Sequence, residues 1–173
     1  GKTLGIVGVG HVGSIVARYA EVMGMRVLRN DPPRAEREGG EGFVSLAQIA
    51  AESDVVTLHV PLTKEGAHPT YHLANAAFFG QLAKRPWLIN SCRGAVHDTA
   101  ALLAAKREGL ISQLIIDCWE QEPTISRALL SEASLATPHI AGFSADGKAN
   151  GTRACLQAIE RFFGIHFALL DRG

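Results

Sequence analysis

Apolar residues along this chain recur in short runs, and between the runs they fall at helical spacing. The short runs predict six strands, at residues 3–7, 25–28, 54–58, 87–90, 114–116 and 134–136. Helical spacing predicts helices at 12–23, 45–52, 75–83, 99–108 and 145–163, and Ser45, Asn75 and Asp98 are placed to cap the second, third and fourth of them. Strands that alternate with helices are typical of β-α-β units. We therefore predict an α/β fold of one domain, a Rossmann-type doubly wound parallel sheet that binds ligands at the carboxyl ends of its strands.

The composition narrows the class of protein. Hydrophobic residues make up 47% of the 173, and Lys+Arg equals Asp+Glu at 17 each. This balance offers no bulk attraction to nucleic acid or to an anionic membrane. No apolar run reaches the roughly 18 residues that a membrane span needs. We expect a soluble, cytoplasmic protein. A strand is predicted almost at the first residue, which suggests a domain taken from a longer chain.

Two further stretches bear on structure and on chemistry. Residues 32–42, PPRAEREGGEG, are charged and rich in glycine and proline, and they predict a surface loop. The cysteines, Cys92, Cys118 and Cys155, are widely spaced with no C-x-x-C pair. That pattern argues against a disulfide framework and a zinc site, so no metal is expected.

The segment IVGVGHVG joins the first predicted strand to the first predicted helix and carries a glycine pattern. Gly8 permits a tight turn, Gly10 lets the backbone approach a pyrophosphate, and Gly13 lets helix and strand pack closely. Asp31 ends the next strand, where a carboxylate can bind the ribose hydroxyls of NAD. These features predict a dinucleotide site that prefers NAD, although Arg34 nearby leaves NADP open.

Other residues are expected to contact the cofactor. His11 and Val12 lie between the second and third glycines and offer backbone N–H groups to the pyrophosphate. Val60, in LHVPLT after the third strand, is placed to pack on the cofactor. Cys92 has no activating histidine beside it in sequence, so we interpret it as a pocket residue that acts through its backbone rather than as a nucleophile.

Polar side chains follow three consecutive predicted strands. Arg93 follows the fourth strand, Asp117 and Glu122 follow the fifth, and His139 follows the sixth. An arginine can hold a substrate carboxylate through two parallel hydrogen bonds. A histidine can carry a proton near neutral pH, and Glu122 within reach would stabilise its charged form. Asp117 is placed to take the carboxamide of the nicotinamide.

Each of these residues alone has a structural interpretation. An arginine at a strand end is usually an exposed ion-pair partner, and a histidine before a glycine turn is usually structural. Their placement on consecutive strands behind a phosphate loop favours hydride chemistry next to a carboxylate. The remaining histidines with no evident chemical partner are interpreted as structural: His59, His68, His72, His97 and His166.

Five motifs in order, GIVGVGHVG, HVPLT, INSCRG, DCWEQEP and PHIAG, resemble the D-isomer-specific 2-hydroxyacid dehydrogenases. The resemblance implies that Arg93, Glu122 and His139 are catalytic, with His139 as the proton donor in the reducing direction. It also implies a set of NAD contacts: Gly8, Gly10, His11, Val12, Gly13, Asp31, Val60, Ser91, Cys92, Arg93, Asp117 and Gly142. NDPPRAEREGGEGFVSL, TYHLAN and HIAGFSADGKANGT resemble the subfamily that oxidises 4-phospho-D-erythronate to its 2-oxo acid in pyridoxal 5'-phosphate biosynthesis.

The sequence departs from that subfamily at two points. Phe143 stands where the subfamily has a tyrosine that contacts the substrate, which leaves the substrate open. The family's substrate lobe and the subfamily's dimerisation domain are not recognisable. We therefore expect residues 1–173 to be an isolated NAD-binding domain of an enzyme that is a homodimer when full length. Two alternatives stay open: another D-2-hydroxyacid dehydrogenase, and a non-catalytic NAD-sensing module.

Overall fold

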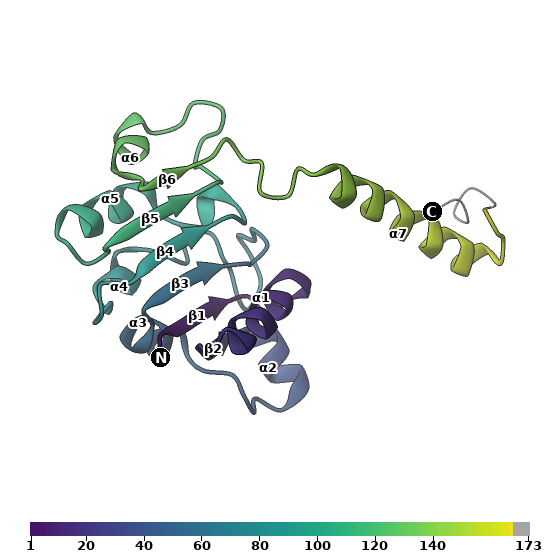
Figure 1. The fold of residues 1–173 in the computed structure, drawn as a ribbon, viewed down its shortest axis with the longest axis horizontal. Helices are drawn as coiled ribbons and strands as arrows, with labels where there is room; N and C mark the ends of the chain where they lie inside the picture. Colours follow the sequence, from purple (N-terminus) through teal and green to yellow (C-terminus); the bar gives the residue numbers. More distant parts are fainter. Residues whose placement is uncertain (168–173) are drawn as a thin grey trace. The chain divides into compact units, whose positions relative to one another are not determined.

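Six parallel strands form one sheet in the computed structural model, which describes residues 1–167. The strands are β1 (Thr3–Val7), β2 (Arg26–Asn30), β3 (Val55–Leu58), β4 (Trp87–Asn90), β5 (Gln113–Ile116) and β6 (Leu135–Ala136). Their order across the sheet is β2-β1-β3-β4-β5-β6 (Figure 1). All the predicted strands form, and the predicted α/β class with a parallel sheet is confirmed.

The register of the strands aligns their carboxyl ends in one row. Val7 pairs with both Asn30 and Leu58, and Asn90 pairs with Leu58 on one side and Ile116 on the other. The residue after each of these strand ends therefore reaches the same edge of the sheet. This edge receives Gly8, Asp31, Ser91 and Asp117 from four different strands.

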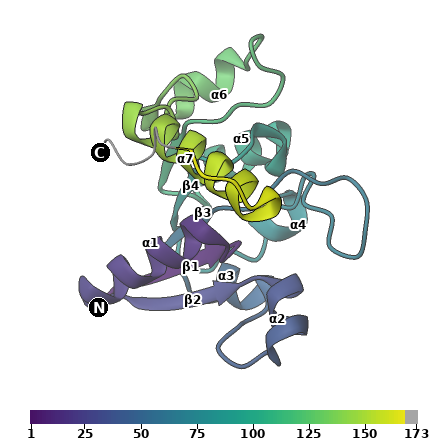
Figure 2. The same cartoon turned by 90° about the vertical axis from the view of Figure 1, so that its right-hand side faces the viewer.

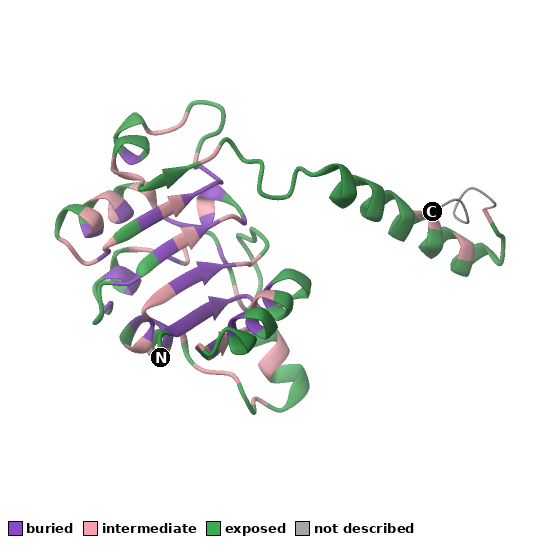
Figure 3. Ribbon diagram, in the orientation of Figure 1, coloured by how far each residue is buried: buried purple, intermediate pink, exposed green. Residues whose placement is uncertain are grey.

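Helices cover the two faces of the sheet (Figure 2). They are α1 (His11–Val22), α3 (Leu46–Glu52), α4 (Ala76–Phe79), α5 (Thr99–Arg107) and α6 (Arg127–Glu132). Ala17 and Ala20 of α1 pack with Leu4 and Ile6 of β1 in the smaller core. The larger core joins the other four helices to the opposite face of the sheet, and the buried residues concentrate in the central strands (Figure 3).

The prediction of a surface loop at residues 32–42 was wrong for its first part. Helix α2 (Pro32–Glu38) forms there, and Gly39 ends it with a φ of 91°. The side chain of Asp31 caps this helix by accepting a hydrogen bond from the backbone N–H of Arg34 at 3.1 Å. The two prolines occupy the first helical positions, where a missing N–H costs nothing. A composition typical of a loop thus contains a helix start signal.

The predicted helix at residues 75–83 is shorter in the structure. Asn75 caps it as expected, accepting from the N–H of Phe78 at 3.1 Å, but α4 ends at Phe79. Gly80 follows at the C-cap, and glycine favours helix ends.

The described residues fall into two compact units, residues 1–138 and a second unit that begins at His139. In the second unit Ser144 caps α7 (Ala145–Phe163) by accepting from the N–H of Gly147 at 2.9 Å. Gly164 ends the helix with a φ of 65°. No helix within residues 1–167 is long and apolar enough to cross a membrane.

Candidate cofactor site and active site

The glycine loop between β1 and α1 gives its three glycines three different surroundings. Gly8 has a φ of 89°, and a Cβ there would lie 2.6 Å from the carbonyl oxygen of His59. A Cβ on Gly13 would lie 2.1 Å from the carbonyl oxygen of Gly8. Gly10, in contrast, has nothing within 4 Å of the place its Cβ would take. The loop is therefore closed on both sides and open at Gly10, where a phosphate needs room.

The amino end of α1 faces the open part of this loop. Gly10 is the N-cap and has no side chain to bond the first backbone N–H groups of the helix. His11 and Val12 open the helix and are exposed. Free N–H groups at a helix start favour an anion. This arrangement supports the expectation that His11 and Val12 offer their N–H groups to a pyrophosphate.

Asp31 lies between the glycine loop and α2. One carboxylate oxygen accepts from the N–H of Val9 at 2.8 Å, and the other accepts from the N–H of Arg34 at 3.1 Å. A carboxylate oxygen has room for more than one hydrogen bond. The two backbone groups therefore fix the orientation of Asp31 while leaving it able to accept from a ribose hydroxyl.

A cavity of about 760 Å³ opens beside Asp31 at the carboxyl ends of β1, β2 and β3. Gly8, Gly10, Asp31 and Val60 all line it, as expected of cofactor contacts. The other lining residues were not predicted as cofactor contacts: Val7, Asn30, Pro32, Pro33, Ala35, Gly40, Phe43, Val44, Ser45, Leu46, His59, Pro61, Thr63, Ala67, His68, Pro69, Thr70 and Leu73. Most of these residues are apolar, and an apolar wall suits the flat ring of an adenine.

These residues fit a dinucleotide. The cavity offers an apolar wall for the base, Asp31 offers a carboxylate for the ribose, and Gly10 leaves space for the pyrophosphate before α1. Each of the three parts matches one chemical part of NAD, in the order in which they occur along the molecule.

Arg93 follows β4 on a short loop that packs tightly against the β5 loop. Its side chain is exposed, whereas its neighbours Cys92 and Gly94 are buried. A Cβ on Gly94 would lie 1.9 Å from the carbonyl oxygen of Trp119. Only a glycine allows this approach, which joins the loop after β4 to the loop after β5. The loop thus exposes the guanidinium of Arg93, while the residues on either side of it are buried.

Asn90, the last residue of β4, fixes the backbone of the loop that carries Arg93 through hydrogen bonds of its side chain. Its side-chain oxygen accepts from the N–H of Cys92 at 3.1 Å, and its amide nitrogen donates to the carbonyl of Arg93 at 2.9 Å. The same nitrogen lies 2.8 Å from Nδ1 of His97. Burial lowers the pKa of His97 to about 4, so its ring is neutral at physiological pH. The sequence indicated no such role for Asn90 or His97.

Glu122 and Asp117 lie on the loop after β5 in the first unit. A carboxylate oxygen of Glu122 accepts from the N–H of Trp119 at 2.6 Å. Asp117 is buried, and its carboxylate accepts from the hydroxyl of Thr137 at 2.6 Å. Glu122 is therefore oriented by its own loop, and Asp117 is oriented by Thr137, the residue after β6.

The cysteine side chains near this edge are not activated. Burial raises the pKa of the Cys92 thiol. Burial and the nearby carboxylate of Asp117 raise the pKa of the Cys118 thiol to about 12. A thiol that stays protonated is a poor nucleophile, which agrees with a pocket role for Cys92. Within residues 1–167 no group of three or more His, Cys, Asp or Glu side chains is placed to hold a metal ion.

His139, Gly142 and Phe143 belong to the second unit. His139 has a φ of 54°, and the ammonium of Lys148 lies 3.6 Å from the centre of the Phe143 ring. Arg93 and Glu122 belong to the first unit, so the approach of His139 to them stays a prediction, as do the contacts of Gly142 and Phe143.

The comparisons with known proteins agree with this geometry. The family described as "D-isomer specific 2-hydroxyacid dehydrogenase, NAD binding domain" matches residues 1–141. The chain belongs to this family. Membership in this NAD-binding domain family makes NAD the cofactor, in agreement with the fit of the glycine loop and cavity.

The similar proteins of this 2-hydroxyacid dehydrogenase family include several named "Erythronate-4-phosphate dehydrogenase". The Porphyromonas gingivalis protein is 55% identical over 170 residues, which are 98% of this chain and 46% of that protein. The Bacteroides thetaiotaomicron protein is 56% identical over 163 residues, or 94% of this chain and 47% of that protein. The chain thus spans about half the length of these curated relatives.

Solved structures of the family have the same fold. D-mandelate dehydrogenase from Rhodotorula graminis superposes with a TM-score of 0.79 and 32% identity, over 94% of this chain and 48% of that one. D-lactate dehydrogenase from Aquifex aeolicus, solved with NAD and lactic acid, superposes with a TM-score of 0.75 and 31% identity, over 94% and 54%.

The histidines interpreted as structural in this dehydrogenase domain have nearby polar partners. His72 lies 2.6 Å from a carboxylate oxygen of Glu120, and His68 lies 2.8 Å from one of Glu36. His59 lies 3.0 Å from the hydroxyl of Thr57, and its pKa is lowered by burial. His166 lies 3.2 Å from a carboxylate oxygen of Glu160.

Proposed function

We propose that this chain is the NAD-binding domain of an enzyme that oxidises 4-phospho-D-erythronate to the 2-oxo acid, a step of vitamin B6 biosynthesis. The observation that carries the proposal is the identity of about 55% to erythronate-4-phosphate dehydrogenases along nearly the whole chain. The site adds chemical support, because an exposed arginine sits at the sheet edge that also carries the NAD features.

Each residue of the proposed catalytic set has one role. Arg93 holds the substrate carboxylate through two parallel hydrogen bonds, since its side chain is exposed and Nη1, which donates to the carbonyl of Cys92 at 2.6 Å, fixes the guanidinium at the sheet edge. His139 takes the proton of the C2 hydroxyl in oxidation and returns it in reduction, and Glu122 stabilises the charged imidazole. The NAD site would supply the acceptor for the hydride that leaves C2. Asp117 orients the cofactor, and Gly142 and Phe143 lie on the segment that follows His139.

The cofactor half of the proposal is tested by titrating the chain with NADH and following nicotinamide fluorescence. We expect saturable binding, and we expect Asp31→Ala to weaken it. The substrate half is tested by assaying protein expressed from the whole reading frame with NAD and a panel of 4-phospho-D-erythronate, D-glycerate, D-lactate and D-mandelate. A preference for an unphosphorylated acid would overturn the proposed substrate and retain the chemistry.

A variant of Arg93 separates an enzyme from an NAD-sensing module. In the same whole-length protein, Arg93→Ala should lower kcat/KM by at least about 100-fold, because a charge-assisted bidentate contact to the substrate is lost. A sensor would show no turnover to lose and would keep NAD binding. We also propose that the whole enzyme is a homodimer, which light scattering would test.

A further inference from the structure

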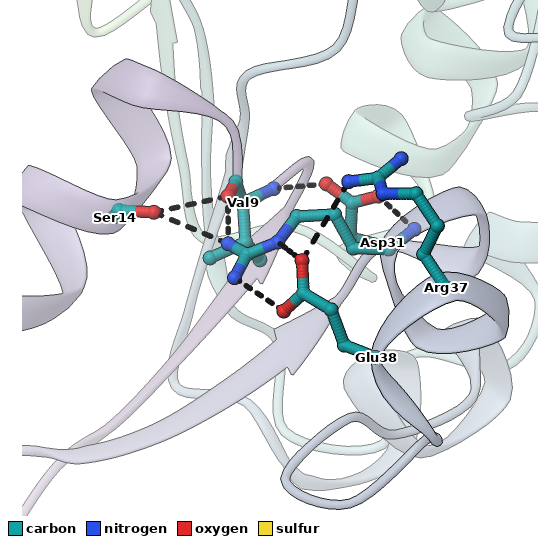
Figure 4. A network of polar contacts seen from close by, with 6 residues as sticks. Val9, Ser14, Asp31, Arg37 and Glu38 are labelled. Carbon is teal, nitrogen blue, oxygen red and sulfur yellow. Dashed lines mark hydrogen bonds and ion pairs between the residues drawn. The ribbon is translucent and has the colours of Figure 1, made fainter.

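Arg34 lies on α2, three residues after Asp31, and its guanidinium contacts Val9, Ser14 and Glu38, which are labelled in Figure 4. Nε donates to one carboxylate oxygen of Glu38 at 2.8 Å, and Nη2 donates to the other at 2.7 Å. Nη1 donates to the carbonyl of Val9 and lies 3.3 Å from the hydroxyl of Ser14. Every nitrogen of the side chain therefore has a partner already.

The surroundings of Arg34 keep both members of the pair charged. The hydrogen bonds with Glu38 raise the pKa of Arg34, and the same bonds lower the pKa of Glu38. The guanidinium also lies over the ring of Phe43, 5.4 Å from its centre. Arg37 reaches Glu38 as well, at 3.6 Å. Glu38 thus pairs with two arginines of α2, Arg34 and Arg37.

The bonded guanidinium of Arg34 lies outside the lining of the cavity. Asp31, Pro32, Pro33 and Ala35 all line the cavity, but Arg34 between them is not one of its lining residues. Its guanidinium is directed instead along the glycine loop toward Val9 and Ser14. An arginine close to the acid that follows the second strand is the group that accommodates the 2'-phosphate of NADP in dinucleotide-binding folds. Here such an arginine is present, but its guanidinium already donates two hydrogen bonds to Glu38.

We propose that Glu38 is a specificity-determining residue, which holds the fork of Arg34 away from the 2'-phosphate of NADP and so reinforces the preference for NAD. The inference rests on the proposed NAD site and extends it to a residue that does not itself contact the cofactor. Asp31 repels the phosphate directly, and Glu38 removes the cation that would otherwise compensate.

The competition between Glu38 and a phosphate favours Glu38 for a physical reason. A carboxylate and a phosphate both accept two parallel hydrogen bonds from a guanidinium, so their geometries are equivalent. Glu38, however, stands four residues along the same helix, a spacing at which side chains meet. An incoming phosphate would also add negative charge beside two acids. When Glu38 is replaced by glutamine, the pair loses its charge attraction. The Nε and Nη2 groups of Arg34 then become available to the 2'-phosphate.

The test measures the ratio of the dissociation constants for NADPH and NADH on the chain itself, by nicotinamide fluorescence. We expect Glu38→Gln to lower this ratio roughly tenfold, the size of one hydrogen bond to a charged group. We expect Arg34→Gln to abolish that change, so that Arg34→Gln and the double variant have the same ratio. Glu41→Gln, on the exposed loop after α2, makes the same change of net charge and should leave the ratio unaltered.

Each outcome decides the matter. A ratio that Glu38→Gln leaves unchanged would overturn the inference, and so would a change of equal size in the Arg34→Gln background or in Glu41→Gln, since either would indicate a general effect of charge. If Arg34→Gln does not fold, as judged by its thermal unfolding, Arg34→Lys takes its place in the cycle because lysine cannot form the bidentate contact. Failure of the unaltered chain to bind NADH would instead contradict the proposed function.

Discussion

The glycine loop after β1 and the Arg93 loop after β4 both carry a glycine pressed against neighbouring backbone, but they differ in what they leave open. In the first loop Gly10 has nothing within 4 Å of its missing Cβ. In the second, Gly94 is closed off by Trp119 and the backbone of the loop is fixed by Asn90. The first loop leaves its backbone open to a ligand, whereas the second exposes the side chain of Arg93 above a tightly packed backbone.

This difference predicts where each loop is sensitive to change. Alterations of the Arg93 loop other than at Arg93 itself should act mainly on folding, because the backbone of the loop is bonded to the buried side chain of Asn90. Alterations of the open part of the glycine loop should act mainly on cofactor binding, since little protein packs there.

The largest effect is expected at Gly94. In Gly94→Ala the new methyl would overlap the carbonyl oxygen of Trp119, and backbone cannot move aside cheaply, so we expect a loss of about 3 kcal/mol in the free energy of unfolding. Urea denaturation measures it. Gly151→Ala, in α7 with nothing within 4 Å of the added atom, is the control and should be neutral or slightly stabilising. Equal stability of both variants would show that the contact between Gly94 and Trp119 does not hold the loop after β4 against the loop after β5.

The next effect concerns pH and His97. Its folded-state pKa of about 4 lies below the value of about 6.5 expected for an unfolded chain, so the neutral ring stabilises the fold above pH 6.5. That stability is lost as the pH falls toward 4, by about 2.5 kcal/mol between pH 7 and 4.5. Urea denaturation at the two pH values should show a smaller loss for His97→Asn, which retains an acceptor for Asn90. An identical loss in both proteins would place the pH dependence elsewhere.

The third effect, at Gly10, is a smaller change in free energy. It should alter the binding of NADH much more than the stability of the fold. In Gly10→Ala the methyl enters the space before α1, and we expect NADH affinity to fall by roughly tenfold because close approach of the pyrophosphate is blocked. The melting temperature should fall by only about 2 °C, since alanine meets no protein atom there but is a weaker N-cap than glycine. A variant that unfolds instead, with NADH affinity retained, would reverse the contrast between the two loops.

The smallest effect is expected at the ion pair between Glu36 and His68. The carboxylate and the ring lie 2.8 Å apart, with 68% of the Glu36 side chain and 32% of the His68 side chain exposed. Glu36→Gln should move the melting temperature by only about 1 °C, because exposed pairs contribute little. Differential scanning fluorimetry checks this. A shift of several degrees would mean that the mouth of the cavity contributes to folding as the Arg93 loop does.

Much of the fold was predictable because its signals are local. Each strand of the sheet appears as a short apolar run, and Ser45, Asn75 and Asp98 cap helices as their positions indicated. Helix α2 was missed because glycine, proline and charge suggested a loop. Its start signal, an aspartate followed by prolines, was present at Asp31 and would have found it.

The candidate site was predictable to a lesser degree, for a reason that its residues show. Gly8, Gly10 and Asp31 follow from strand, turn and helix spacing, and they line the cavity as expected. Asn90 and His97 were not found, because a hydrogen bond between them depends on how the loop folds back over the strand end. Most of the apolar lining also comes from loops whose course has no periodic signal.

The amino-acid sequence by itself determined the order of strands and helices, the phosphate-binding turn and the set of polar residues at the strand ends. These depend on backbone preferences and spacing within a few neighbouring residues, which act before any distant contact forms. The tertiary structure alone decided that Gly94 meets Trp119, that His97 is kept neutral and that Glu38 occupies Arg34. Those outcomes depend on packing and on the loss of water around charged and polar groups, and both arise only when separate segments are brought together.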